Sequence, residues 1–122
     1  LSLTACNFAP TKQSINDLSA VHIIEQRQNI KAKPQTKQNH TRLIKQNYNC
    51  EIEFTAYFKT GRATEHWIFK NNELIASYSK LETETEKKDI VFNPTDPITL
   101  ANFHALKNNF SKKSLKQCHF DL

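Results

Sequence analysis

The stretch Cys50-Glu51-Ile52-Glu53-Phe54-Thr55-Ala56-Tyr57-Phe58 alternates in character from residue to residue. Its first, third, fifth, seventh and ninth side chains are apolar, and those between them are polar or carry a hydroxyl group. A period of two residues is typical of a strand with one buried face. We therefore expect the core to begin here and the Glu51, Glu53 and Tyr57 side of the strand to stay outside it.

Two turns are predicted downstream of this strand. The only glycine of the chain is Gly61, and we expect a turn around it because glycine takes positive φ without strain. Residues 63–70 then run back along the first strand. The pair Asn71-Asn72 predicts a second hairpin turn, since Asn tolerates the left-handed conformation. This turn predicts the cross-strand pairs Lys70–Glu73, Phe69–Leu74, Ile68–Ile75, Trp67–Ala76 and Glu65–Tyr78.

The last part of the chain predicts a short strand and a helix. Residues 81–88 are charged and read as an exposed turn or a polar strand extension, and residues 89–92 form a strand that ends at Asn93-Pro94. Asp96-Pro97 has the order of an N-cap and a first-turn proline. The apolar stripe of the helix is Leu100, Phe103, Leu106 and Phe110. The predicted fold class is α+β: in residues 48–122, a small antiparallel β-meander of about four strands with a C-terminal helix packed on one face.

Residues 6–47 are rich in Gln, Asn, Lys, Thr and Ser, and we expect them to form a flexible leader. Within this range Ser14 is a possible helix cap, and residues 20–24 fit a short strand equally well. Residues 31–40 show no apolar periodicity and are interpreted as linker.

Leu3-Thr4-Ala5-Cys6 resembles the lipobox of bacterial lipoproteins, in which the signal peptide is cut just before the cysteine. The resemblance implies that residues 1–5 are the remnant of a signal peptide and that Cys6 carries the lipid that anchors the chain to a membrane. It also implies a location in the bacterial cell envelope. In this family an Asp after the cysteine often marks inner-membrane retention, so Asn7 favours the outer membrane, with the domain facing the periplasm.

If Cys6 carries lipid, the two remaining cysteines form an even pair in a compartment that favours disulfides. We predict a Cys50–Cys118 disulfide, which in the chain-entropy model stabilises the fold by about 4 kcal/mol. The competing interpretation, a cysteine-based metal site or a catalytic thiol, lacks a CxxC motif.

Catalytic, metal and nucleic-acid functions find little support in the residue pattern. No Gly-rich phosphate loop or GxSxG motif is present, and no two of His66, His104 and His119 have HxxxH or HxH spacing, so we expect no enzyme, cofactor or metal site. The net charge of +5 alone does not indicate nucleic-acid binding, because the positive excess lies in residues 6–49. The ferredoxin-like RNA-binding fold also needs a helix between its first two strands, and here the predicted strands follow one another directly. An envelope location excludes nucleic acid as well.

The predicted function is a non-enzymatic binding or structural accessory module of the cell envelope, with an envelope protein as its partner. The candidate partner-binding residues are Glu51, Glu53, Tyr57 and His66. The alternative is a lipid-anchored periplasmic inhibitor of a hydrolase such as lysozyme. Tyr48-Asn49-Cys50 with the late Cys118 resembles the entry into the disulfide-linked β-barrel of small lysozyme inhibitors, although their Ser- and Gly-rich inhibitory loop is absent from this sequence.

Overall fold

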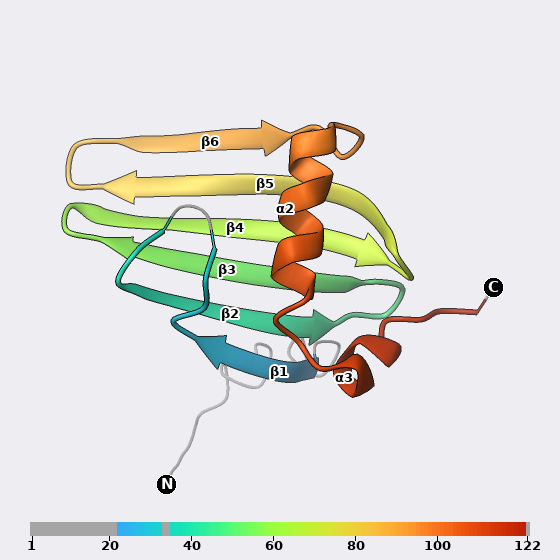
Figure 1. Cartoon of the computed structure of the whole chain (residues 1–122). Helices are drawn as coiled ribbons and strands as arrows, with labels where there is room; N and C mark the ends of the chain where they lie inside the picture. Colours follow the sequence, from blue (N-terminus) through green and yellow to red (C-terminus); the bar gives the residue numbers. More distant parts are fainter. Residues whose placement is uncertain (1–21, 33–34, 122) are drawn as a thin grey trace, which may run out of the picture.

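The computed structural model describes residues 22–32 and 35–121. Within these ranges six strands form one antiparallel sheet, and each strand pairs with the next along the chain. The strands are β1 (His22–Gln28), β2 (Gln38–Lys45), β3 (Cys50–Phe58), β4 (Gly61–Lys70), β5 (Glu73–Thr83) and β6 (Lys87–Phe92). Two helices follow, α2 (Pro97–Lys107) and α3 (Lys112–Lys116). Figure 1 shows α2 crossing one face of the sheet, called the helix face below, and α3 near β1. The opposite face is called the far face.

The predicted meander and the helix on one face are confirmed, with six strands in place of about four. The alternation of β3 is confirmed over most of its length, because Cys50, Ile52, Phe54 and Ala56 are fully buried. Phe58 departs from it and is 38% exposed. Since α2 crosses the sheet nearer the start of β3, the end of this strand lies beyond its cover (Figure 1).

The sheet begins well before residue 50, which corrects the prediction of a flexible leader for the described part of residues 6–47. β2 was not predicted from the sequence because its buried side chains include the polar Asn39 and Thr41 as well as Leu43, which breaks the apolar period. Asn39 is satisfied by the connection that follows β1: its amide donates to the Ile30 carbonyl, and its Oδ1 accepts from the Ile30 amide at 2.8 Å. The predicted cap at Ser14 lies outside the described residues.

β1 is held to the C-terminal part of the chain as well as to β2. Oε1 of Glu25 accepts hydrogen bonds from the backbone N–H and the hydroxyl group of Ser111, the N-cap of α3. Burial alone would raise the pKa of Glu25, but hydrogen bonds from Ser114, Ser111 and Arg27 outweigh it and lower the pKa to about 2. The ionised form of Glu25 therefore fastens the edge strand to α3.

The two predicted turns are present, with one change at each. Gly61 is the first residue of β4, and its φ is not positive. A glycine is needed there because a Cβ atom would collide with the Glu82 carbonyl oxygen. At the second turn Asn71 takes φ 57°, as expected.

The register of the β4–β5 hairpin agrees with the prediction only near its turn. Lys70–Glu73 and Phe69–Leu74 pair as predicted. A bulge at Ile75 then shifts the partners of Ile68, Trp67 and Glu65 to Ala76, Ser77 and Ser79. Without the bulge, the side of β5 that buries Leu74 would also carry Tyr78 and Lys80 into the core, so the extra residue keeps these polar groups out.

The helix α2 begins at the predicted cap. Oδ2 of Asp96 accepts from the backbone N–H groups of Ile98 and Thr99 at 3.1 Å, and Pro97 occupies the first turn. Phe103 and Leu106 are buried against the sheet, and so is Phe110 just beyond the helix end. None of the described helices is long and apolar enough to cross a membrane.

The predicted disulfide is confirmed. Cys50 at the start of β3 is bonded to Cys118 after α3, and both residues are fully buried in the core. The bond closes a segment of 68 residue steps that contains four of the six strands and both described helices.

Candidate functional site

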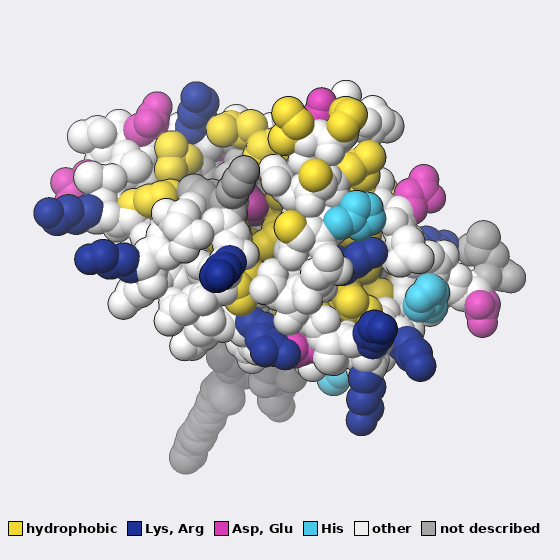
Figure 2. Space-filling model, in the orientation of Figure 1, with side chains coloured by type: hydrophobic (Ala, Val, Ile, Leu, Met, Phe, Trp, Pro, Cys, Tyr) yellow, Lys and Arg dark blue, Asp and Glu magenta, His cyan; other side chains and the backbone are white. Residues whose placement is uncertain are grey.

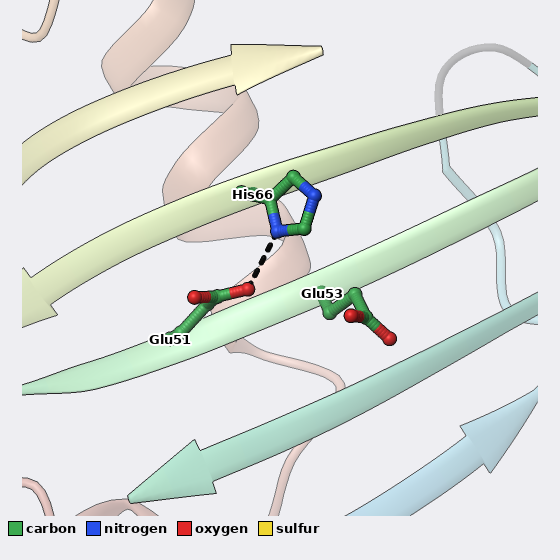
Figure 3. A group of neighbouring side chains, drawn as sticks. All are labelled: Glu51, Glu53 and His66. Carbon is green, nitrogen blue, oxygen red and sulfur yellow. Dashed lines mark hydrogen bonds and ion pairs between the residues drawn. The ribbon is translucent and has the colours of Figure 1, made fainter. Parts of the chain in front are cut away.

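Three of the four predicted partner-binding residues lie together on the far face. Glu51 and Glu53 alternate on β3, and His66 faces Glu53 across the β3–β4 pair, so the three side chains share one side of the sheet (Figure 3). One ligand atom from each lies within 4.8 Å of the others. We call these residues the far-face cluster. Within the described residues, the only such group of metal-type ligands includes neither His104 nor His119.

The charges of the far-face cluster are largely paired inside the protein. His66 Nδ1 lies 2.6 Å from Glu51 Oε2, and Arg42 Nη2 lies 2.7 Å from Glu53 Oε1. Tyr78 stacks on the His66 ring at 4.7 Å between centroids. Burial and the negative charges of Glu51 and Glu53 raise the pKa of Tyr78. The cluster is thus a nearly satisfied polar network, with side-chain exposures of 12% for Glu51 and 18% for His66.

Tyr57 lies apart from this cluster. It pairs with Arg62 and Gln38 near the end of β3 and is 44% exposed, so it presents an open surface of its own. A partner that used all four predicted residues would have to cover most of the length of β3. The assignment of these residues to a partner stays a prediction.

A different site lies on the helix face. A cleft of about 510 Å³ opens between α2 and the connection from β1 to β2, with β4 as its floor. Its lining is Lys31, Ala32, Gln35, Glu65, Trp67, Phe92, Thr99, Asn102, Ala105 and Leu106. Figure 2 shows a strip of apolar side chains between α2 and this connection. We call this site the Glu65 cleft.

Glu65 supplies the only carboxylate among the described residues that line this cleft. The alternation of β4 places it on the helix face with Trp67 and Phe69, and it is 8% exposed. The indole Nε1 of Trp67 donates to Glu65 Oε1 at 3.0 Å. Burial raises the pKa of Glu65 to about 7, and the Trp67 hydrogen bond only partly opposes this shift. A carboxyl group that titrates near neutral pH inside a cleft is a recognised mark of a functional site.

Aromatic rings form the other part of the floor. The Trp67 ring stacks on Phe92 of β6 at 5.7 Å between centroids and on Phe103 of α2 at 6.4 Å. Trp67 is 2% exposed, so these neighbours hold it in place. The cleft combines flat apolar surfaces with one polar group at a defined position.

Glu65 was not among the candidate functional residues predicted from the sequence, so the cleft was missed. A signal that could have found it is the period of two residues in this strand, which puts Glu65 on the same face as Trp67 and Phe69. A carboxylate at a core-facing position of an apolar strand is uncommon unless it has a partner or a task. The other wall of the cleft was not predictable, because it comes from Lys31, Ala32 and Gln35, which lie in the stretch interpreted as linker.

No protein-family model, no curated protein and no solved structure matches this chain. The geometry of the far-face cluster and of the Glu65 cleft is therefore the basis for any proposal about function.

Proposed function

We propose that this protein is a lipid-anchored, non-enzymatic binding module of the bacterial cell envelope, and that its ligand is a small molecule held in the Glu65 cleft. The observation that carries the proposal is the cleft itself. Its volume of about 510 Å³ lies in the range of small-molecule sites, which are mostly apolar and use a few placed polar groups. Glu65 is such a group, at the bottom of aromatic and aliphatic walls.

The composition of the lining favours binding over catalysis. Acid–base or nucleophilic catalysis needs a second reactive group within hydrogen-bond reach of the first. Among the described lining residues, Glu65 is bonded to the Trp67 indole, and Thr99 has its hydroxyl group 3.3 Å from Asp96 in the helix cap. These contacts hold side chains in place and do not activate a nucleophile.

The envelope location is supported by the Cys50–Cys118 disulfide, because such bonds persist in oxidising compartments. Mass spectrometry of the protein, expressed in bacteria from its full-length gene, tests the anchor. We expect a diacylglycerol-modified peptide that begins at Cys6. An unmodified protein in the cytoplasmic fraction would refute the proposed location.

Ligand binding is tested with the neutral fluorescent probe N-phenyl-1-naphthylamine, whose emission rises in apolar surroundings. We expect saturable binding that the cleft-filling substitution Ala105→Phe abolishes, since Ala105 lines the cleft from α2. Ala101→Phe is the matched control, because Ala101 is an exposed residue of the same helix outside the lining. Equal probe binding by both variants would exclude the cleft as the site. Circular dichroism checks that both variants are folded.

A further inference from the structure

Two features of the Glu65 cleft define the chemistry of its occupant. The first is the buried carboxyl group: among the described residues, Trp67 is its one hydrogen-bond donor, and that bond goes to Oε1. Oε2 is thus left as an acceptor for a molecule in the cleft. The second feature is the apolar surface beside the carboxyl group, where Phe92 is half-buried and its ring lies 8° from parallel with the covered ring of Trp67.

The groups around Glu65 provide little competing charge. On the strands next to it, its cross-strand partners are Phe54 and Ser79, neither of which is charged. The α2 residues that line the cleft are Thr99, Asn102, Ala105 and Leu106, and β6 contributes Phe92. Lys31 is the other charged residue of the described lining, and it is exposed on the connection that follows β1. Among the described lining residues, a cation that enters the cleft therefore meets one negative group, Glu65, which is buried, and one positive group, Lys31, which is exposed to solvent.

We propose, building on the small-molecule function proposed above, that the ligand of the Glu65 cleft is an organic cation: an ammonium head group attached to an apolar body that carries a ring. The ammonium group pairs with Oε2 of Glu65, and the body lies against the half-buried ring of Phe92 and against Ala105 of α2. Charge complementarity selects this class, because an anion would be repelled by Glu65 and a neutral molecule would form no ion pair.

This pairing couples binding to the loss of a proton. Because burial raises the pKa of Glu65 to about 7, the carboxyl group is mainly neutral below that pH and must ionise to pair with an ammonium group. We expect the affinity for the cation to rise about tenfold per pH unit up to about pH 7 and to level off above it. The affinity for a neutral analogue should show no such rise.

The experiment compares three ligands with the same body: 4-phenylbutylammonium, 4-phenylbutan-1-ol and 4-phenylbutanoate. Trp67 is the only tryptophan in the chain, so its fluorescence reports occupancy of the cleft directly. At pH 8 we expect the ammonium compound to bind at least about tenfold more tightly than the alcohol, as for one charge-assisted hydrogen bond. The substitution Glu65→Gln keeps an oxygen for the Trp67 indole and removes the charge, so this ratio should fall to about one. Glu84→Gln, in the exposed β5–β6 turn, is the control that keeps the ratio.

The outcomes separate this inference from the function on which it builds. Equal affinities for the ammonium compound and the alcohol, or tightest binding of the carboxylate, would overturn the cation assignment and leave a small-molecule cleft. Failure of all three ligands and of the neutral naphthylamine probe would overturn both. If Glu65→Gln does not fold, the wild-type protein decides: an ammonium affinity that does not change between pH 5.5 and pH 8 overturns the inference.

Discussion

At the scale of single residues, the buried carboxyl group of Glu65 makes the stability of the fold depend on pH up to neutrality. Its pKa is raised from 4.5 to about 7 in the fold, so between these values the folded protein holds a proton that the unfolded chain has lost. The contribution of the neutral Glu65 carboxyl group to the unfolding free energy is complete below about pH 4.5 and is lost as the pH rises through about 7. The shift corresponds to about 3 kcal/mol of unfolding free energy.

We therefore predict that the wild-type protein loses about 3 kcal/mol of unfolding free energy between pH 4.5 and pH 8, and that Glu65→Gln does not. Urea denaturation at a series of pH values measures this, with Glu84→Gln as a control that follows the wild type. Identical pH profiles for the wild type and Glu65→Gln would show that the carboxyl group is not held neutral by burial.

The far-face cluster gives a second prediction at this scale. Arg42 already neutralises Glu53, and His66 is bonded to Glu51, so we expect zinc to leave the melting temperature of the wild-type protein unchanged. Arg42→Gln frees the Glu53 carboxylate, and zinc should then raise the melting temperature by about 5 °C through binding to the folded state. Adding His66→Ala should remove that rise. A zinc-induced rise in the wild type would mean that Arg42 does not block the site.

At the scale of secondary-structure elements, the β4–β5 pairing depends on the absence of a side chain at Gly61. A Cβ atom there would meet the Glu82 carbonyl oxygen and would lie 2.8 Å from Cα of Thr83, which are both backbone atoms. We predict that Gly61→Ala lowers the unfolding free energy by about 2 kcal/mol or more, since the strands must separate locally. Thermal denaturation measures the loss. Thr60→Ala, one residue earlier in the exposed turn, should change stability by less than about 0.5 kcal/mol.

The elements also show how far a sequence pattern reaches. β3, β4, β6 and the start of α2 were predictable because their apolar period, turn residues and cap all agree. β2 was not predictable, because Asn39 and Thr41 occupy inward positions. Asn39 can be buried there because it forms hydrogen bonds with Ile30 in the connection between β1 and β2. The bulge at Ile75 was not predictable either. It is needed because Leu74 is buried while Lys80 must stay outside the core, and regular alternation would put both on the same side of β5. The alternation of β4 puts Glu65 on the same face as Trp67 and Phe69, but the cleft around it depends on α2 and on Lys31, Ala32 and Gln35, which lie far from it in the sequence.

At the scale of the whole molecule, the disulfide is the strongest single constraint. Removing it with Cys50→Ala and Cys118→Ala should lower the unfolding free energy by about 4 kcal/mol, because the unfolded chain gains the freedom of a segment of 68 residue steps. Urea denaturation of the oxidised wild type and of the double variant measures the difference. A loss below about 1 kcal/mol would indicate that the unfolded chain is compact without the bond.

The position of Cys50 also divides the molecule mechanically. β1 and β2 precede the covalent ring, whereas β3 to β6 and both described helices lie within it. A pulling force applied between the two ends of the chain therefore unzips β1 and β2 first and stops at Cys50, where the load passes through the disulfide to Cys118. The wall of the Glu65 cleft made by Lys31, Ala32 and Gln35 belongs to the part that unzips, and Glu65 itself belongs to the ring. A force on the N-terminal side of the domain would thus open the cleft, the site of the proposed ligand, while the part within the ring stays folded.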